Sequence, residues 1–162
     1  MDKAKKYLGE LLEAIIIVAV LYTVFFPARV DGNSMENTLN DGDTIFVSRA
    51  AAFTGLYKND DIIVFEHKKG NKNISLIKRI AASEGDKVEG RDEKLYINGK
   101  EKEGYKCEEE FEYILGKDEY FVLGDNADES TDSRVFGIIK SSQVKARAVI
   151  KVFPLNDIKI LL

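Results

Sequence analysis

An apolar run near the N-terminus constrains this chain more than any other feature. The run extends from Ala14 to Phe26 without a charged side chain, and Pro27 follows it. It is shorter than the roughly 20 apolar residues that a membrane-spanning helix needs. A spanning helix must therefore recruit earlier residues and hold Glu10 and Glu13 near the boundary of the bilayer. The recruited apolar residues are Tyr7, Leu8, Leu11 and Leu12.

A removed signal peptide has the same basic start and short apolar core. However, Pro27 to Val30 contain no small-x-small cleavage site, which favours a retained anchor. Residues 3–6 hold three lysines, whereas Arg29 is a lone cation just after the run, and this bias predicts a cytoplasmic N-terminus. We expect residues 1–27 to form the cytoplasmic end and the transmembrane anchor, and residues 28–162 to form an extracytoplasmic domain.

Beyond the anchor, the apolar residues fall into short runs that are typical of β strands. These runs are rich in Ile, Val, Phe and Tyr and are separated by Gly, Asn and Asp. The strongest turn signal is Asn98-Gly99, because both residues tolerate the positive φ angles of a two-residue hairpin. We therefore expect a mainly antiparallel β fold. The predicted strands are Thr44–Ser48, Asp61–Phe65, Ile74–Ile80, Lys94–Ile97, Tyr120–Leu123 and Val144–Phe153.

Other segments have weaker patterns. The polar segment His67–Asn73 is interpreted as a loop, and the acidic segment Glu101–Glu112 as a mobile insertion. Short helical turns are expected after Asn37 and around Ser141–Gln143. The segment Ala50–Tyr57 is apolar enough either to dip into the membrane interface or to pack in the core, and the sequence leaves both options open.

Composition excludes two classes of function. The formal net charge of -4 argues against a general nucleic-acid binder, which needs a basic face to neutralise phosphates. The single cysteine, Cys107, cannot form an internal disulfide. Because Cys107 precedes three glutamates, its thiolate is disfavoured, which argues against a catalytic or metal-binding role.

Two stretches carry candidate catalytic chemistry. Ser34 follows Gly32-Asn33, and its hydroxyl needs a base before it can act as a nucleophile; lysine is one known base for serine. Strand alternation places Lys78 on one face with Leu76 and Ile80, and such apolar neighbours lower a lysine pKa and favour the neutral base. The alternatives are a turn-capping hydroxyl at Ser34 and a lysine that extends to water.

A third stretch, Gly124 to Arg134, is dense in side chains that bond to backbone groups. It follows an apolar strand and serves either as a rigid connection or as support for an active site. Asp132 and Arg134 are suited to a structural ion pair, and the Ser130 hydroxyl is a candidate partner for the lysine nitrogen.

Taken together and in this order, with Asp41-Gly42-Asp43 between the first two, the three stretches resemble the motifs of type I signal peptidases, which are membrane-anchored serine proteases. Ser34-Met35 stands where the family has its nucleophilic Ser-Met, and Lys78-Arg79 where it has its Lys-Arg. Gly124 to Arg134 match the last signature of the family. With the anchor, the resemblance covers nearly the whole chain.

The resemblance implies roles for individual residues. Ser34 would attack the carbonyl at the end of a signal peptide, and Lys78 would be the general base. The Ser34 backbone N–H would serve the oxyanion hole, and Ser130 would orient Lys78. Four further residues would support the site, namely Asp125, Asn126, Asp132 and Arg134.

The resemblance also implies the setting of the reaction. It implies a catalytic domain of coiled antiparallel β sheets, like that of signal peptidases and LexA, which acts as a monomer without a metal or cofactor. The substrates would be signal-peptide-bearing precursors at the lipid bilayer, with small residues, typically alanine, one and three positions before the cut. No nucleic-acid partner is expected.

Four positions depart from common family residues. Some relatives have serine in place of Gly32, and many have proline in place of Asn37. Ala127 replaces a frequent arginine, and Glu129 a frequent asparagine. None of these changes removes a catalytic group. Without a hydroxyl at position 32, oxyanion stabilisation rests more heavily on backbone donors.

Three other functions remain open from the sequence. The only histidine, His67, permits a Ser34–His67–Asp triad in principle, although it lies in a lysine-rich segment. The chain could instead be an inactive, membrane-tethered β domain that binds exported proteins. The presence of both Ser34 and Lys78 argues against that reading. A protease dedicated to a narrow set of substrates is the third alternative.

Overall fold

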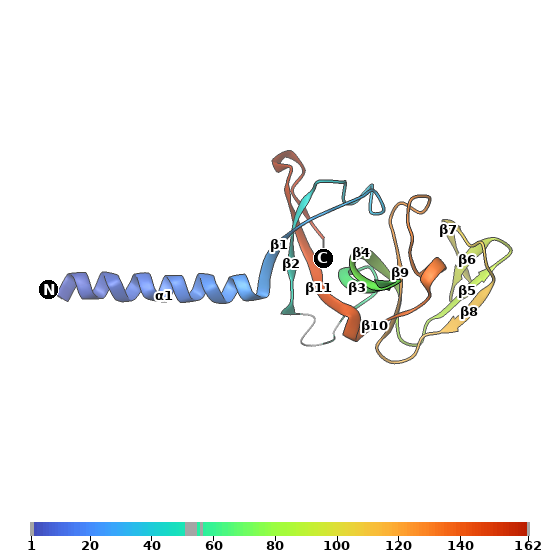
Figure 1. Ribbon diagram of the computed structural model, residues 1–162, viewed down its shortest axis with the longest axis horizontal. Helices are drawn as coiled ribbons and strands as arrows, with labels where there is room; N and C mark the ends of the chain where they lie inside the picture. The colour runs from blue at the N-terminus through green and yellow to red at the C-terminus, as the bar shows by residue number, and fades with distance from the viewer. Residues whose placement is uncertain (1, 51–54, 56, 162) are drawn as a thin grey trace.

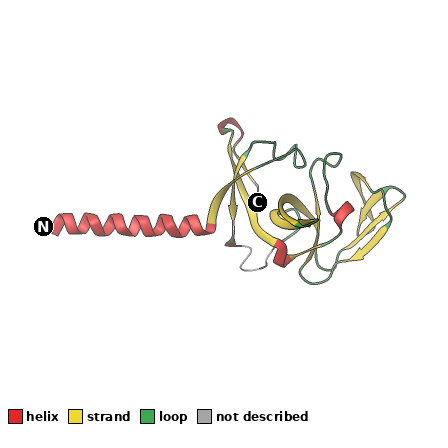
Figure 2. Ribbon diagram, in the orientation of Figure 1, coloured by secondary structure: helices red, strands yellow, loops and turns green. Residues whose placement is uncertain are grey.

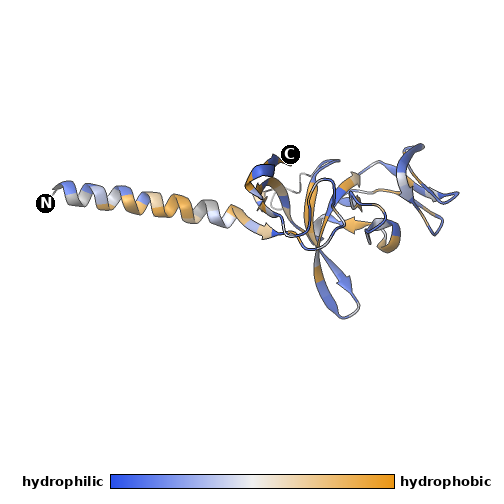
Figure 3. Ribbon diagram, turned by 90° about the horizontal axis from the view of Figure 1, so that it is seen from above, coloured by the Kyte–Doolittle hydropathy of each residue, from blue (hydrophilic) through white to orange (hydrophobic). Residues whose placement is uncertain are grey.

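The computed structural model describes residues 2–50, 55 and 57–161, and in it one long helix leads directly into a β domain (Figure 1). This helix, α1, spans Asp2–Val24. Its segment Lys6–Val24 has a mean hydropathy of 1.9, and no part of the most apolar window is buried against the rest of the protein. Figure 3 shows apolar residues concentrated along the middle of the helix. The expected anchor helix is therefore present, and its length and composition suit a bilayer.

The helix ends earlier than the apolar run does. Phe25 and Phe26 belong to the first strand, β1 (Phe25–Arg29), which pairs antiparallel with β2 (Thr44–Ser48). Pro27 lies in β1 and lacks a backbone N–H, which is tolerated because β1 is an edge strand of its sheet. The chain therefore passes from the helix into the sheet without a linker.

The main sheet has eight strands, and every neighbouring pair is antiparallel (Figure 2). Its strand order is β1-β2-β11-β3-β4-β9-β10, with β12 also paired to β11. The remaining strands of this sheet are β3 (Ile62–Lys69), β4 (Lys72–Ala82), β9 (Glu119–Leu123), β10 (Ile139–Lys140), β11 (Val144–Phe153) and β12 (Lys159–Ile160). Short helical turns are α3 (Ser133–Phe136), η1 (Ser141–Gln143) and η2 (Leu155–Asp157).

A second, four-stranded sheet lies at the end of the molecule away from α1 (Figure 1). Its order is β7-β6-β5-β8, built from β5 (Lys87–Arg91), β6 (Lys94–Ile97), β7 (Lys100–Lys106) and β8 (Phe111–Ile114). Asn98 and Gly99, with φ angles of 52° and 76°, form the tight turn between β6 and β7. The predicted hairpin is therefore confirmed.

The mainly antiparallel β fold and all six predicted strands are confirmed, but two segments were misread. His67–Asn73 is not a loop: β3 and β4 continue through it and turn at Gly70, where φ is 61°. Glu101–Glu112 is not an unstructured insertion, because it supplies most of β7 and the start of β8. Backbone pairing with neighbouring strands holds these polar segments. The prediction for Ala50–Tyr57 falls largely outside the described residues.

The register of β3 against β4 fixes which core each side chain enters. Val64 lies opposite Ile77, and both pack against a cluster that contains Ile45. Ile63 lies opposite Lys78, on the other face, where Ile63 belongs to a second cluster. Lys78 therefore projects from the sheet on an apolar face.

A buried lysine connects the end of β11 to the segment after Ser34. Lys151 is only 2% exposed, and its Nζ lies 3.2 Å from Asp43 Oδ2. It also donates hydrogen bonds to the Asp157 carboxylate and, at 3.4 Å, to the Thr38 carbonyl oxygen. Because the charge is buried, these oxygens are needed to compensate its lost hydration.

Candidate active site

Ser34 and Lys78 meet although they are far apart in the sequence. Lys78 Nζ lies 2.6 Å from Ser34 Oγ and 3.0 Å from the Ile77 carbonyl oxygen. The lysine is only 3% exposed. Burial lowers the pKa of Lys78 from its ordinary value, and the charges of Asp132 and Asp125 only partly oppose this shift. The pair thus combines a hydroxyl with an amine that loses its proton easily.

A tight turn presents Ser34 to the lysine. Gly32 has a φ of +89°, and its N–H donates a 2.8 Å hydrogen bond to Asp41 Oδ1. The positive φ favours glycine and would strain a serine, which explains the residue at this position. The Ser34 N–H donates no hydrogen bond within the described part of the chain, so this donor is available beside the hydroxyl.

Gly124 allows the third stretch to approach Ser34 closely. A Cβ atom at Gly124 would lie 2.4 Å from the Ser34 carbonyl oxygen and 2.2 Å from Ser130 Oγ. The Asn126 N–H donates to the same Ser34 carbonyl at 3.1 Å, and the Asn126 side chain donates to Glu36 at 3.1 Å. Glycine is needed because any larger residue would push these segments apart.

Ser130 is close to the pair but is not bonded to it. Its buried hydroxyl oxygen has no hydrogen-bond partner in the described structure. The hydrogen bond to Lys78 that the sequence suggested is therefore not formed in this state.

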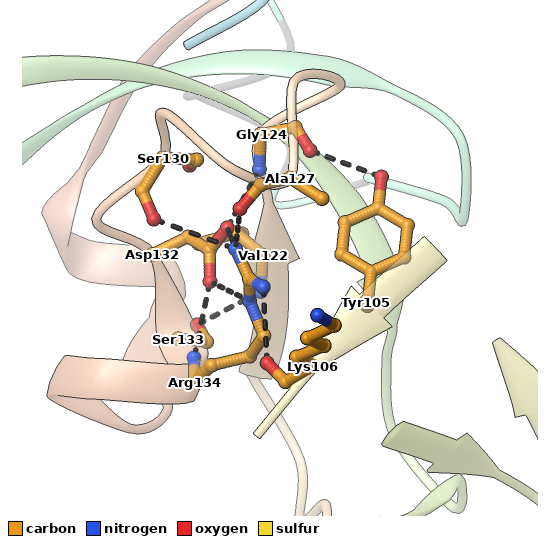
Figure 4. Close-up of polar contacts among 9 residues, drawn as sticks. All are labelled: Tyr105, Lys106, Val122, Gly124, Ala127, Ser130, Asp132, Ser133 and Arg134. Atoms are coloured by element: carbon orange, nitrogen blue, oxygen red, sulfur yellow. Dashed lines mark hydrogen bonds and ion pairs between the residues drawn. The ribbon is translucent and has the colours of Figure 1, made fainter. Parts of the chain in front are cut away.

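Asp132 and Arg134 hold the third stretch in shape (Figure 4). The Arg134 side chain lies 2.9 Å from Asp132 Oδ1, and Asp132 Oδ2 accepts a 3.0 Å hydrogen bond from the Gly124 N–H. Asp132 is fully buried, so these donors compensate its lost hydration. Arg134 also donates to three carbonyl oxygens, those of Lys106, Ala127 and Ser130.

Arg79 links the turn that contains Ser34 to the third stretch. Its guanidinium lies 2.6 Å from Asp125 Oδ2, and it donates to Thr38 Oγ1 at 3.3 Å. Two residues of this network were not predicted from the sequence: Thr38, and Tyr105, whose hydroxyl donates to the Gly124 carbonyl oxygen at 3.0 Å (Figure 4). Neither residue has a local signal, because each contact depends on the tertiary fold.

Two pockets adjoin the Ser34–Lys78 pair. The first pocket has a volume of about 310 Å³ and is lined mainly by small and aliphatic side chains together with Phe26. The small and aliphatic side chains include Ala28, Val30, Ile45, Val64 and Ile77. The second pocket has a volume of about 360 Å³ and a mixed lining that includes His67, Lys69, Ile74, Leu76, Glu129 and Phe136.

The other candidate groups take no part in the Ser34–Lys78 contact. The His67 ring stacks on Phe136 with the ring centroids 4.4 Å apart, and no hydrogen bond joins His67 to Ser34 among the described residues. Cys107 is buried, and burial raises the pKa of its thiol. In the described part of the chain, no three His, Cys, Asp or Glu side chains are grouped in a way that suits a metal ion.

Replacing buried Lys78 or buried Lys151 by methionine should have opposite effects on the free energy of unfolding. The pKa of Lys78 is lowered, so its charge opposes folding below that pKa, and the penalty fades as the pH rises toward 10.5. Lys78→Met should therefore raise the free energy of unfolding at pH 7 by on the order of 1 kcal/mol. Burial also disfavours the charge of Lys151, but the bonds to Asp157 and Asp43 outweigh it and raise its pKa. Lys151→Met should cost about 3 kcal/mol, because Asp43 stays buried without its partner.

Urea denaturation of the detergent-solubilised chain at pH 7 and at pH 9.5 measures both effects. The gain from Lys78→Met should shrink at the higher pH, whereas the loss from Lys151→Met should persist there. Equal destabilisation by both substitutions would show that the Lys78 charge is not penalised in the folded state.

Asn37 has a backbone conformation that proline cannot adopt. Its φ is 79°, whereas the proline ring holds φ near -65°. Asn37→Pro should therefore destabilise the protein by more than about 1 kcal/mol and weaken the placement of Ser34. Asn37→Gly is the matched control, since glycine accepts a positive φ. Its free energy of unfolding should lie within about 1 kcal/mol of the wild-type value. Thermal unfolding of both variants decides this, and equal stability of the two would contradict the assigned backbone.

Comparisons with known proteins identify the family of this chain. The family model "Signal peptidase, peptidase S26" matches residues 5–153. Signal peptidase IB of Staphylococcus aureus is 32% identical over 93% of this chain and 93% of its own, and signal peptidase I of Bacillus licheniformis is 34% identical over 96% and 94%. A crystal structure of a signal peptidase I from Enterococcus faecalis is 28% identical, with a TM-score of 0.43, and covers 57% of this chain and 96% of that one. The match along almost the whole chain shows that this protein belongs to the signal peptidase family, peptidase S26.

Proposed function

We propose that Ser34 and Lys78 perform the cleavage by which this signal peptidase removes signal peptides from secreted precursors. The observation that carries the proposal is the 2.6 Å separation between Ser34 Oγ and the buried Lys78 Nζ. Neutral Lys78 takes the hydroxyl proton while Ser34 Oγ attacks the scissile carbonyl. The same proton then passes to the leaving amine, and a water molecule activated by Lys78 hydrolyses the acyl-enzyme.

The groups around the pair have supporting roles. The Ser34 N–H is the donor for the developing oxyanion. The unpartnered Ser130 hydroxyl is a hydrogen-bond partner for Lys78 when the lysine gains the proton. Asp132 and Arg134 fix the position of Ser130 through the network in Figure 4. Asp125 and Asn126 support the nucleophile turn through Arg79 and Ser34, respectively.

The substrate lies in extended form between β1 and β4. β9 pairs with β4 only at Arg79, Ile80 and Ala82, so the described structure leaves the Lys72–Lys78 edge of β4 unpaired on the side away from β3. β1 also pairs on one side only. Residues of both strands line the first pocket, so a peptide strand between them places small side chains in it.

The anchor determines where the reaction takes place. We infer that α1 spans the membrane with its N-terminus in the cytoplasm, so that residues 1–27 comprise the cytoplasmic end, the anchor helix and the first residues of β1. Residues 28–162 then form the extracytoplasmic catalytic domain. Ser34 follows the end of α1 by ten residues, which reach at most about 35 Å. One chain supplies both Ser34 and Lys78, which supports our proposal that the protein works as a monomer.

Substitution of the pair tests the chemistry. Cleavage of a membrane-inserted precursor with an Ala-x-Ala site should fall by about 10³-fold or more in Ser34→Ala and in Lys78→Arg. Arginine keeps the positive charge but does not release its proton, so it cannot act as the base. The wild-type rate should rise with pH as Lys78 deprotonates, with a midpoint below the ordinary lysine value of 10.5.

His67→Ala is the control for the alternative triad, and it should keep a Ser34-dependent cleavage rate. Loss of activity in His67→Ala together with cleavage by Lys78→Arg would refute the Ser–Lys pair. Binding of the precursor without cleavage by the wild type would indicate an inactive binding domain.

Thiol labelling tests the membrane orientation. Single cysteines at Lys3 and at the exposed Lys117 are introduced into a Cys107→Ser background. A membrane-impermeant maleimide should label Lys117→Cys but not Lys3→Cys in intact cells, because only the β domain lies outside. Lysed cells provide the control, in which both positions should react. Labelling of Lys3→Cys alone in intact cells would show the reverse orientation.

A further inference from the structure

The second pocket has no role in the cleavage chemistry described above. Strand register places His67, Ile74, Leu76 and Lys78 on one face of the β3–β4 pair. Ile77, which lines the first pocket, lies on the opposite face. Both pockets reach Ser34, Leu76 and Lys78, and both extend back along β4 from Lys78 toward its start. The site therefore has one pocket on each face of the strand beside the substrate.

An extended peptide presents alternate side chains to these two pockets. Successive side chains of a strand point to opposite faces. If the residues one and three positions before the cut occupy the first pocket, the residue between them points toward the second pocket. This step rests on the proposed function, which places the substrate strand along β4. The second pocket also follows Leu76 and Ile74 away from Lys78, and the first pocket, which would hold the residues before the cut, extends in the same direction to Ser75.

The lining of the second pocket defines the side chain that fits. Its inner part contains half-buried apolar side chains, including Leu76 and Phe136, whereas Asp31, Lys69 and Glu129 lie exposed at its rim. The volume of about 360 Å³ has room for a long side chain. Such a side chain can pack its aliphatic stem on the apolar part and place its charged end at the rim. Two carboxylates and one ammonium at the rim favour a cation.

Glu129 is positioned to read that charge. Its Oε2 accepts a 3.2 Å hydrogen bond from Asn33 Nδ2, and both residues line the pocket, so this bond holds the carboxylate beside the residue that precedes Ser34. The other carboxylate oxygen has no hydrogen-bond partner within the described structure. Lys69, the last residue of β3, also lines the pocket and repels a cation.

We propose that the second pocket binds the residue between the two small residues of the cleavage site, and that Glu129 makes this protein prefer lysine or arginine there over glutamate or aspartate. This signal peptidase therefore selects among precursors at a position flanked by the two small residues. The preference is set by charge at the rim, whereas the first pocket selects by size.

The test uses the full-length protein in detergent and membrane-inserted precursors that contain Ala-Lys-Ala, Ala-Gln-Ala or Ala-Glu-Ala at the cut. The quantity measured is the ratio of kcat/KM for the lysine precursor to that for the glutamate precursor. The wild-type ratio should exceed one. Glu129→Lys should lower it about three- to tenfold, since a partly exposed charge contact contributes modestly and its reversal adds repulsion. Lys69→Glu should raise the ratio by a similar factor.

Glu103→Lys is the matched control, because this exposed glutamate in β7 changes the net charge equally, far from the second pocket. Its ratio should equal that of the wild type. An unchanged ratio in both Glu129→Lys and Lys69→Glu, with the glutamine precursor still cut, would overturn this inference and leave the proposed function standing. Failure of the wild type to cut any of the three precursors would instead count against the proposed function. A ratio that Glu103→Lys shifts as much as Glu129→Lys would also overturn it, because the effect would then follow net charge.

Discussion

The burial of Lys78 beside Ser34 is the interaction on which the rest of the structure depends. An amine in water stays protonated at neutral pH and cannot act as a base. The fold excludes water from the Lys78 amine in two ways. Lys78 lies on a strand face with Leu76 and Ile80, and the turn that contains Ser34 covers it. In the mechanism that we propose, the burial that lets Lys78 act as a base also makes its charge costly for folding, so catalysis and stability oppose each other at this residue.

The contacts around the pair supply the order that this arrangement needs. Gly124 lets the third stretch lie against the Ser34 carbonyl, and the buried Asp132 carboxylate accepts a hydrogen bond from the Gly124 N–H. Thr38 connects two further supports, since its hydroxyl meets Arg79 and its carbonyl meets Lys151. Segments remote in sequence are thereby held to the nucleophile turn by buried polar groups, which are favourable only when each has its partner.

The sequence predicted what depends on periodicity and local turn chemistry. Alternation correctly placed Lys78 on an apolar face, and Asn98-Gly99 correctly predicted the hairpin between β6 and β7. Prediction from alternation failed at β7, because this strand is almost entirely exposed and its residues do not alternate between apolar and polar. Only the pairing of β7 with β6 holds it in place. The positive φ of Asn37 and the Thr38–Arg79 contact were also unpredictable, since both depend on how distant segments close around the turn. Motif order indicated Ser34 and Lys78, but their contact had to come from the fold.

The direct passage from α1 into β1 joins membrane position to substrate geometry. Val24 ends the helix, Phe25 starts the strand, and that strand leads to Ser34 within the same sheet. A flexible linker would let the catalytic domain sample many heights above the bilayer, whereas a paired strand restricts them. In the arrangement that we propose, a precursor still anchored by its own apolar helix meets the site at a limited height, and its cleavage segment must reach both pockets there. On this proposal, the tether contributes to selection of the cleavage site before any substrate side chain enters a pocket.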